Sequence, residues 1–425
     1  PSYLATGVRA EGDPQPPSKR INLGCVGVGG RAGGVIPGLC NKGNAQPVAF
    51  ADVDYSARNV EKNLKRWPGV KQYSDFREMM DKSGKDIDAV SIVVPDQSHF
   101  CATLLAMSMG KHVYVEKPLT HSFQEAELLM RAEKKFKVVT QMGNQGHTGT
   151  ASNQFREWVK KGVIKNVTHV DAWKGPSCFF MQKDKRISEW PKREAQPKGM
   201  NWDLWLGPAE YHPFSRMYHT FEWRGFHPYG SGMLGDWGCH IIDMIHHYLD
   251  LGLPTEIKAQ RMDDHNEVIF PLNSHMQFKF PARGKHPELT LNWKDGVNCQ
   301  AEVPKKYWDN PEKPPRLGGA GTLFKVEGAD YMSQRNSHGG SSRLFPYAKS
   351  KDLDLKTENV REDHLESFVQ ACLGNGKTRS PFSVGGLLTQ VLTLGCIAQY
   401  FNPVSYTHLR AHETVLDLVC RLLLE

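Results

Sequence analysis

The chain has 425 residues, and its 53 Lys and Arg against 46 Asp and Glu give a formal net charge of +7. With 39% hydrophobic and 23% charged residues, its composition is that of a globular protein with two or three domains and a large core. The basic residues are scattered, the nine cysteines form no C-x-x-C pair, and we find no apolar run long enough to cross a bilayer. These features argue against a nucleic-acid partner, a structural zinc site, a disulfide framework and a membrane anchor.

Both ends of the chain differ in character from the rest. Residues 1–19 are rich in Pro, Gly and Ser and are predicted to form a disordered leader or linker. Residues 404–425 resemble a translated sequencing adapter, so we predict that they are a non-native tail without function. We therefore look for function in residues 20–403.

The first apolar segment, Ile21–Val26, predicts a strand that runs into a glycine-rich turn. The turn fits the fingerprint G-x-G-x-x-G/A with Gly27, Gly29 and Ala32. Gly27 permits the tight turn, Gly29 lets the backbone approach a pyrophosphate, and Ala32 allows the next helix to pack closely on the strand. The N–H groups at the start of that helix can bind phosphates, so the pattern predicts a dinucleotide site.

A second predicted strand, over residues 48–51, ends in Asp52, which lies twenty residues after Ala32. A carboxylate at that spacing accepts hydrogen bonds from the adenosine ribose hydroxyls. The same carboxylate would repel a 2′-phosphate. The sequence therefore favours NAD over NADP.

Strand-like and helical segments continue to alternate as far as residue 141, which predicts a doubly wound parallel sheet. One of these strands, His112–Val115, is followed directly by Glu116, Lys117 and Pro118. Because proline ends the strand, the last side chains face the crevice beyond the sheet, where ligands bind. Lys117 is there either a structural ion-pair partner or a chemical group. We assign residues 20–145 to a dinucleotide-binding domain.

After residue 145 the pattern changes to apolar runs with a period of two, near residues 276–280, 289–293 and 323–326. This period indicates strands with one covered face, and hence a C-terminal α/β domain over residues 146–403 with an open, mainly antiparallel sheet. Within it, residues 173–237 form a long segment that holds six of the ten tryptophans. Such a segment either binds the apolar faces of sugar rings or simply anchors itself.

In the same segment, Asp236 and His240 lie four residues apart on a predicted helical turn. Their side chains would share one face, where the carboxylate could orient the imidazole as a general base. A satisfied structural pair is the alternative. His219, His227 and His246 have no spacing typical of metal ligands relative to His240, so no metal is predicted.

Five motifs follow one another along the chain: G-x-G-G-R at 27–31, the Asp after the second strand, P-D-x-x-H at 95–99, G-K-H-V-Y-x-E-K-P at 110–118 and D-x-G-x-H-x-x-D at 236–243. Over residues 20–403 they resemble the glucose–fructose oxidoreductase/inositol dehydrogenase (Gfo/Idh/MocA) family. The resemblance implies a Rossmann domain with bound NAD, followed by an open antiparallel α/β domain for substrate binding. It also implies a homo-oligomer, dimer or tetramer, that assembles through the second sheet.

The resemblance implies roles for single residues as well. Lys117 matches the family's active-site lysine, and Asp236 and His240 match its catalytic pair, with His240 as the proton acceptor. The implied cofactor-binding residues are Gly27, Gly29, Gly30, Arg31, Asp52, Pro95, His99 and Glu116. Position in the chain suggests as substrate-binding residues Asn144, Gln145, Arg224, His227 and Tyr229.

These roles imply an NAD-dependent oxidoreductase that removes hydride from a hydroxyl-bearing carbon of a sugar, polyol or glycoside. The alternative within the family is a redox-neutral NAD-dependent glycosidase, which oxidises a hydroxyl, eliminates the aglycone and reduces the ketone again. A nucleotide-binding sensor without turnover is disfavoured because Lys117, Asp236 and His240 are all present. Residues 201–211 resemble a branch whose members often carry an export signal, so we expect a periplasmic protein, with the cytoplasm as the alternative.

Overall fold

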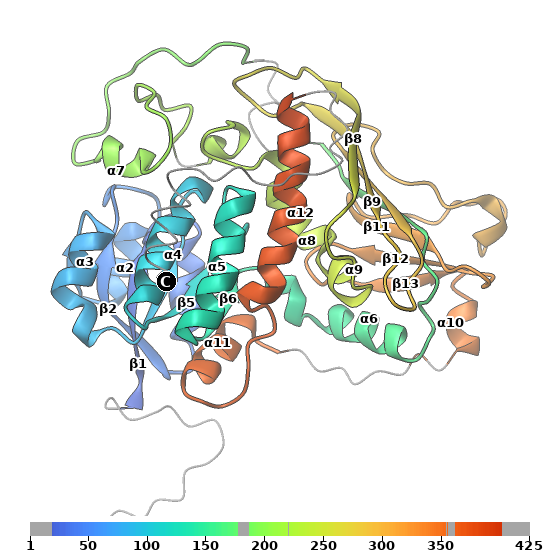
Figure 1. The fold of residues 1–425 in the computed structure, drawn as a ribbon, viewed down its shortest axis with the longest axis horizontal. Coiled ribbons are helices and arrows are strands. Elements are labelled where there is room, and N and C mark those ends of the chain that lie inside the picture. The colour runs from blue at the N-terminus through green and yellow to red at the C-terminus, as the bar shows by residue number, and fades with distance from the viewer. Residues whose placement is uncertain (1–18, 177–186, 220, 354, 356–361, 402–425) are drawn as a thin grey trace, which may run out of the picture.

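The computed structural model describes residues 19–176, 187–219, 221–353, 355 and 362–401. Two sheets lie side by side, with one long helix between them (Figure 1). The predicted non-native tail, and all of the predicted leader except residue 19, lie outside the described residues.

The first sheet confirms the predicted doubly wound fold. Its strands are all parallel, in the order β3-β2-β1-β4-β5-β6. The inner strands β1, β4 and β5 are buried at nearly every residue, as expected where helices cover both faces of a sheet. The strand order reverses between β1 and β4, which opens a crevice at their carboxyl ends. The strands are β1 (Ile21–Val26), β2 (Ala45–Ala51), β3 (Lys71–Tyr73), β4 (Ala89–Ile92), β5 (His112–Val115) and β6 (Thr140–Met142).

Helices pack on both faces of this sheet (Figure 1). They are α1 (Ala32–Leu39), α2 (Val60–Arg66), α3 (Phe76–Ser83), α4 (His99–Ser108) and α5 (Phe123–Phe136). α5 begins at a capping box, in which the side chains of Ser122 and Glu125 each accept a hydrogen bond from the other's backbone N–H. The sequence did not indicate β3, because this three-residue edge strand is polar and partly exposed.

The second sheet is mixed and mostly antiparallel, as predicted. Its order is β13-β12-β11-β7-β10-β9-β8, and among these described neighbours only β7 and β10 run parallel. In β9 the predicted period of two is present, since Met276, Phe278 and Phe280 are buried and the residues between them are not. The strands are β7 (His169–Lys174), β8 (Glu256–Asp263), β9 (Asn273–Phe280), β10 (Leu289–Asp295), β11 (Ala320–Lys325), β12 (Met332–Asn336) and β13 (Ser342–Phe345).

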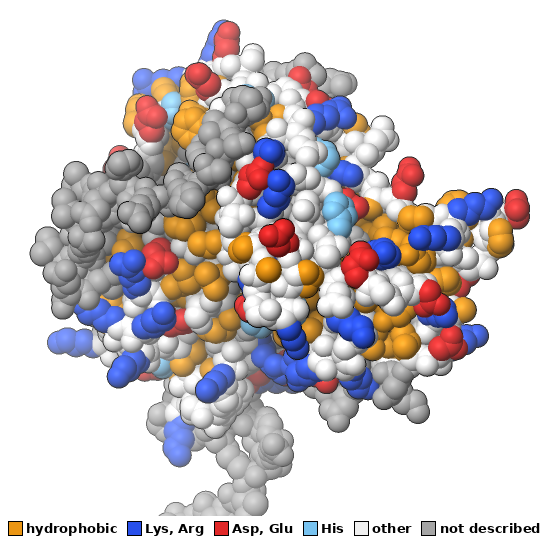
Figure 2. Space-filling view, turned by 45° about the vertical axis from the view of Figure 1, so that its right-hand side comes forward, with side chains coloured by type: hydrophobic (Ala, Val, Ile, Leu, Met, Phe, Trp, Pro, Cys, Tyr) orange, Lys and Arg blue, Asp and Glu red, His pale blue; other side chains and the backbone are white. Residues whose placement is uncertain are grey.

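The outward face of the second sheet is polar over β9, β10 and part of β7, whereas an apolar cluster around Trp173 and Leu323 covers another part of it. On β10, Asn292 donates to Asp171 Oδ1 on β7 (3.2 Å) and accepts from Gln277 Nε2 on β9 (3.2 Å). Figure 2, turned toward this side of the molecule, shows hydrophobic atoms in patches between charged side chains. These polar side chains are hydrogen-bonded to one another within the sheet. Their presence on this face therefore does not indicate an interface with another subunit. The expected homo-oligomer stays a prediction.

α12 (Phe382–Phe401) is the long helix between the two sheets (Figure 1). It packs against α5 on one side and against α8 (Gly232–Ile241) and β8 on the other. By length and composition α12 could cross a membrane, so the expectation that no such apolar run exists is wrong. In the fold, however, 72% of its apolar window is buried by protein, which is typical of a central core helix.

α11 (His364–Cys372) also returns to the first sheet. Leu365 lies against α1 at Gly38, and Glu366 Oε1 accepts a hydrogen bond from Asn44 Nδ2 at 2.9 Å. Residues of α11, far beyond the predicted boundary at 145–146, therefore pack against the part of the molecule that is built on the first sheet. The division of the chain into domains at that boundary stays a prediction.

The aromatic segment forms a small core of its own around α7 (Trp202–Leu206). Trp202, Trp205, Tyr218, Phe226 and Tyr229 are all buried in it. The rings of Trp202 and Trp205 stack with their centroids 4.5 Å apart. For Trp202, Tyr218, Phe226 and Tyr229 the structure supports the anchoring interpretation rather than an exposed sugar-binding surface.

Candidate active site

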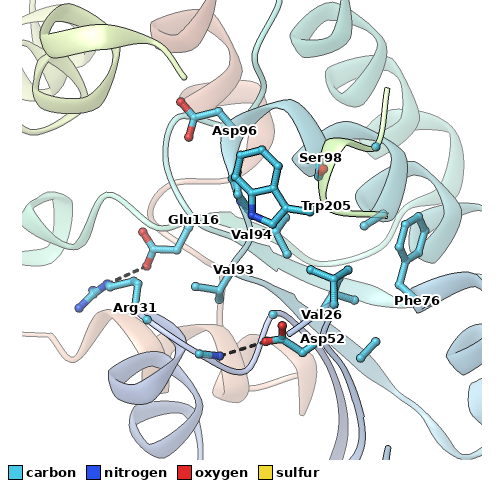
Figure 3. A pocket seen from close by; sticks show the side chains of 18 of the residues that line it. Val26, Arg31, Asp52, Phe76, Val93, Val94, Asp96, Ser98, Glu116 and Trp205 are labelled. Carbon is cyan, nitrogen blue, oxygen red and sulfur yellow. Dashed lines mark hydrogen bonds and ion pairs between the residues drawn. The ribbon is translucent and has the colours of Figure 1, made fainter. Parts of the chain in front are cut away.

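A cavity of about 1510 Å³ lies at the carboxyl ends of β1, β2, β4 and β5. It exceeds the usual range of about 300–1,000 Å³ for small-molecule pockets, so it has room for a dinucleotide together with a substrate. Figure 3 shows its walls, with Asp52 and Glu116 at strand ends and Trp205 from the aromatic segment. The predicted site residues that line it are Gly27, Gly29, Gly30, Arg31, Asp52, Pro95, Glu116, Lys117, Gln145, Arg224, Asp236 and His240.

The glycine-rich turn after β1 forms one end of the cavity. Gly27 has a φ of +81°, and a Cβ there would lie 2.1 Å from the Val93 carbonyl oxygen, so only glycine fits. Asp52 accepts hydrogen bonds from the N–H groups of Val28 (2.7 Å) and Gly29 (3.2 Å), which fastens the turn to the end of β2 (Figure 3). Burial raises the pKa of Asp52. The close-approach turn, the start of α1 and this carboxylate fit the pyrophosphate and ribose of a dinucleotide.

Glu116 connects the glycine-rich turn to the end of β5. Its carboxylate is buried and accepts a hydrogen bond from Arg31 Nε at 3.2 Å (Figure 3). Gln145 Nε2, in the loop after β6, lies 3.5 Å from the same oxygen. The loops after β1, β5 and β6 thus meet at one carboxylate.

Lys117 and Asp236 form an ion pair between the end of β5 and α8, with side chains 12% and 13% exposed. The ammonium of Lys117 donates to Asp236 Oδ1 and to its backbone oxygen (3.2 Å), and Arg224 Nε lies 3.5 Å from Oδ1. Burial opposes both charges, but the attraction between them outweighs it, so the pKa of Lys117 is raised and that of Asp236 is lowered. Both groups are charged near neutral pH, and the ammonium keeps one N–H for a ligand.

His240 lines the cavity beside this pair, but Asp236 does not hydrogen-bond it. Asp236 is engaged by Lys117 and Arg224, and Nδ1 of His240 is buried without a hydrogen-bond partner in the part of the chain that the structure describes. The prediction that Asp236 orients His240 is therefore wrong, because the stronger attraction of the ammonium draws the carboxylate away. Burial, together with the positive charge of Lys117, holds the pKa of His240 well below its usual value, so the imidazole is neutral.

α7 and the residues around it form a roof over the cavity at the ends of β2 and β4. On the β2 side, the N–H of Asn201 donates to the Val53 carbonyl oxygen at 2.9 Å. On the β4 side, Gln97 Nε2 donates to the Trp205 carbonyl oxygen at 3.1 Å. Trp205 lines the cavity from above the turn after β4 (Figure 3). The roof is thus fastened on both sides of the crevice in which the dinucleotide fits.

His99 does not face the cavity, contrary to its predicted role in cofactor binding. Its ring is buried, with Nδ1 2.8 Å from the Pro118 oxygen and Nε2 2.9 Å from the Val94 oxygen. Both nitrogens are occupied by backbone, so His99 fixes the loop after β4 to the loop after β5. Its contribution to the site is the position of these two loops.

Asn144, His227 and Tyr229 are likewise not among the described residues that line the cavity, so the structure does not bring them to the site with the other predicted residues. Asn144 and Tyr229 are fully buried. His227 packs on the ring of Phe270, with centroids 4.2 Å apart, and its Nε2 lies 3.2 Å from the Asn266 oxygen. Within the described ranges, no group of three or more His, Cys, Asp or Glu side chains is placed to hold a metal ion.

His338 is a residue of the site that the sequence did not indicate. It lies in the turn between β12 and β13, lines the cavity and stacks on His240 with ring centroids 3.7 Å apart. The two glycines that follow it predict only a turn. Trp205 and Trp237 also line the cavity; the sequence placed them in the aromatic segment, for which it left sugar binding and anchoring open.

Comparison with curated proteins finds partial matches at low identity. The α-N-acetylgalactosaminidase of Shewanella oneidensis is 26% identical over 165 residues, which cover 37% of this chain and 35% of the relative. Glucose-6-phosphate 3-dehydrogenase of Bacillus subtilis is 22% identical over 244 residues, which cover 57% of each chain. The chain thus spans about a third of the length of the first relative and somewhat more than half of the second.

Solved structures match over most of the chain. The WlbA dehydrogenase of Bordetella pertussis, crystallised with NADH and UDP-GlcNAcA, has a TM-score of 0.60 at 12% identity, covering 91% of this chain and 98% of that one. An oxidoreductase of Thermotoga maritima has a TM-score of 0.59 at 16% identity, with the same coverage of 91% and 98%. At these identities the likeness shows a shared fold.

Two models of one oxidoreductase family match consecutive parts of the chain. The model of its NAD-binding Rossmann fold matches residues 21–144, and the model of its C-terminal α/β domain matches residues 150–283. Lys117 lies in the first match, and Asp236 and His240 lie in the second. The chain therefore belongs to the Gfo/Idh/MocA family of oxidoreductases and carries the NAD-binding Rossmann domain of that family.

Proposed function

We propose that this protein oxidises a hydroxyl-bearing carbon of a sugar, polyol or glycoside with NAD as the hydride acceptor. The observation that carries the proposal is the convergence of a charged Lys117–Asp236 pair and a neutral His240 in one cavity with the glycine-rich turn. Such a cavity provides a general base, a cation that can stabilise negative charge on oxygen, and a dinucleotide site. Oxidation of an alcohol by NAD requires these three groups.

His240 takes the proton in this proposal. As an alcohol becomes a carbonyl, its O–H proton must leave, and a neutral imidazole in the cavity wall can accept it. The depressed pKa of His240 keeps the imidazole unprotonated, and so competent as a base, throughout the neutral range. When bound, NAD supplies the acceptor for the hydride that leaves the same carbon.

Lys117 stabilises the reacting oxygen. Two of its three N–H groups are directed to Asp236, which leaves one for an oxygen in the cavity. Asp236 keeps the ammonium charged in spite of its burial, so the donor is ready before the negative charge develops on the oxygen. Glu116 and Arg31 hold the neighbouring turn, and with it the dinucleotide, in place.

The substrate class rests on the cavity wall and on the relatives. Arg224 lines the cavity, and its guanidinium lies 4.3 Å from the ring centroid of Trp223, which fixes it for hydrogen bonding. Gln145 adds an amide to the same cavity wall. The matched relatives act on an acetylgalactosaminide and on glucose 6-phosphate, by their names. Carbohydrate hydroxyls suit these donors and acceptors, and the particular sugar is left to experiment.

A redox-neutral glycosidase is the second candidate, and the roof over the cavity favours it. Because the roof is fastened to the loops after β2 and β4, a bound dinucleotide would leave slowly. An enzyme that reduces its own ketone intermediate regenerates the cofactor without releasing it. Slow dissociation of the cofactor therefore does not lower its turnover rate. A dehydrogenase must exchange the cofactor at every turnover.

One assay separates the two candidates. The protein is incubated with NAD and a panel of free sugars, polyols and chromogenic glycosides, while NADH absorbance and aglycone release are followed in the same sample. Stoichiometric NADH without aglycone establishes the dehydrogenase, and aglycone without net NADH establishes the glycosidase. If neither signal appears with any compound, the proposed substrate class is wrong.

Two broader expectations are part of the same proposal. We propose a homo-oligomer assembled through the second sheet, which light scattering on the purified protein tests. We also propose export to the periplasm, which protease protection in intact and permeabilised cells tests.

A further inference from the structure

The base of the proposed reaction needs something to hold its ring, and the predicted partner does not do so. Asp236 is bound to Lys117, and Nδ1 of His240 has no hydrogen-bond partner among the described side chains and backbone. An imidazole without a hydrogen bond at either nitrogen can rotate unless its faces are packed. The question is therefore what packs against the faces of His240.

His338 covers one of these faces. The two rings are 23° from parallel, with their centroids 3.7 Å apart, which is direct stacking contact. The backbone N–H of His338 also donates to the carbonyl oxygen of His240 at 3.1 Å. Trp237 lies edge-on to both rings, with its centroid 5.1 Å from His338 and 6.4 Å from His240. The ring is thus held by packing rather than by a carboxylate.

The turn that carries His338 packs against Gly146, in the loop after β6 of the first sheet. His338 has a φ of +55°, a left-handed conformation that is uncommon for a residue with a side chain. The backbone of Gly146 packs directly against this turn, since a Cβ on Gly146 would lie 2.6 Å from the backbone of His338. Gly339 is equally close, because a Cβ there would lie 2.5 Å from the Gly146 oxygen. The loop after β6 therefore sets the position of His338.

We propose that His338 is a positioning residue for His240: it stacks on the imidazole and keeps the ring directed into the cavity. The inference rests on the proposed function, in which His240 is the base. Part of His338 is exposed to solvent, but the packing of its ring and the positive charge of Lys117 lower its pKa, so the imidazole is neutral near pH 7. Its charge-free ring can therefore lie on His240 without repulsion, and its removal would open one face of His240 to water.

The first experiment needs no substrate. Histidine imidazoles labelled with ¹⁵N are titrated by NMR in the NADH complex, and the His240 signal is assigned by its loss in His240→Ala. In the unchanged protein we expect His240 to protonate below pH 6.5. In His338→Asn, which tolerates the left-handed backbone but has no ring, we expect this midpoint to rise by about one pH unit. His286→Asn, in the turn between β9 and β10 and away from the cavity, is the matched control and should leave the midpoint unchanged.

The second experiment uses the panel compound that is turned over fastest. His338→Asn should lower kcat about 10- to 100-fold with KM, melting temperature and NADH affinity nearly unchanged, because a misplaced base slows the chemical step alone. His338→Phe restores a flat ring and should recover most of kcat. Should His338→Asn fail to fold, His338→Gly carries the same test, since glycine takes a positive φ without strain.

Three results would overturn the inference. One is a His338→Asn protein with unchanged kcat and an unchanged His240 titration. Another is equal loss of kcat in His338→Asn and His338→Phe without any change in the titration, which would mean that His338 contacts the substrate directly. The third is loss of kcat together with NADH affinity and thermal stability, which would mean a structural role. If instead His240→Ala retains full activity, the proposed function is wrong. The comparison of the His240 titration in the unchanged protein and in His338→Asn would still test whether His338 packs on His240.

Discussion

The two walls of the cavity are built in different ways. One wall consists of the loops after β1, β2, β4 and β5. Its functional residues lie close to the ends of strands, as Asp52 directly follows β2 and Lys117 lies two residues after β5. The other wall consists of α7, the residues before α8, α8 itself and the turn after β12, which span residues 201 to 340. A parallel sheet places the ends of its strands together by construction, whereas the second wall depends on tertiary packing throughout. The catalytic proposal needs both, since Lys117 comes from one wall and His240 from the other.

The largest effect is expected where the second wall supplies the base. His240→Ala removes the proton acceptor and should lower kcat about 10²- to 10⁴-fold, the range for general bases. NADH binding, measured by fluorescence, should stay within twofold, because the dinucleotide site lies in the first wall. His286→Ala serves as the control, since His286 lies in the turn between β9 and β10 and does not line the described cavity. Turnover that survives in His240→Ala would place the base elsewhere.

The contact between the walls can be broken at Asp236. Asp236→Asn leaves the ammonium of Lys117 without its carboxylate, and burial then lowers the pKa of Lys117. We expect kcat/KM to fall about 10- to 100-fold and the alkaline limb of its pH profile to move below pH 10. Removing one partner of a buried ion pair also costs about 3–5 kcal/mol of unfolding free energy, which urea titration measures.

The double variant Lys117→Met/Asp236→Asn sharpens this test. Replacing both charges removes the unpaired ammonium, so part of the lost unfolding free energy should return, while activity should not. A double variant as unstable as Asp236→Asn would show that the pair is not coupled as its geometry indicates. An active double variant would show that Lys117 is a structural residue, the alternative that its sequence context left open.

The same contrast explains what the sequence could and could not predict. Gly27, Asp52 and Lys117 were found because a strand, a turn and a helix in fixed order imply a location without any knowledge of distant residues. The pairing of Asp236 was misjudged because helical spacing suggested His240, four residues away, while the true partner is 119 residues distant in the chain. His338 gave no signal at all. Its role depends on a loop contact with Gly146, and no local pattern encodes such a contact.

The roof is the part of the second wall whose loss should have a moderate effect. Trp205→Ala removes a ring that lines the cavity and stacks on Trp202, while the hydrogen bond from Gln97 to the backbone oxygen of residue 205 is kept. We expect the dissociation rate of NADH, measured by stopped-flow fluorescence, to rise about tenfold with a smaller change in the association rate. Trp190→Ala is the matched control, because this tryptophan belongs to the same aromatic segment, stacks on His212 at 3.6 Å and does not line the described cavity. Equal rates in the two variants would mean that the roof does not retain the cofactor.

The smallest effect is expected when the pH is varied near neutrality in the unchanged protein. In this range Lys117 is charged and His240 is neutral, as the reaction requires. The pKa of His240 lies well below 6.5, so the base stays neutral as the pH falls to that point, and it is lost by protonation only at lower pH. The pKa of Lys117 lies above 10.5, so the ammonium persists as the pH rises through the same range. We therefore expect kcat/KM to vary less than about twofold between pH 7 and 9, and the acid limb to fall below pH 6.5. An acid limb centred above pH 6.5 would mean that His240 is exposed to solvent or that another group is the base, and repeating the profile in His338→Asn distinguishes these two cases.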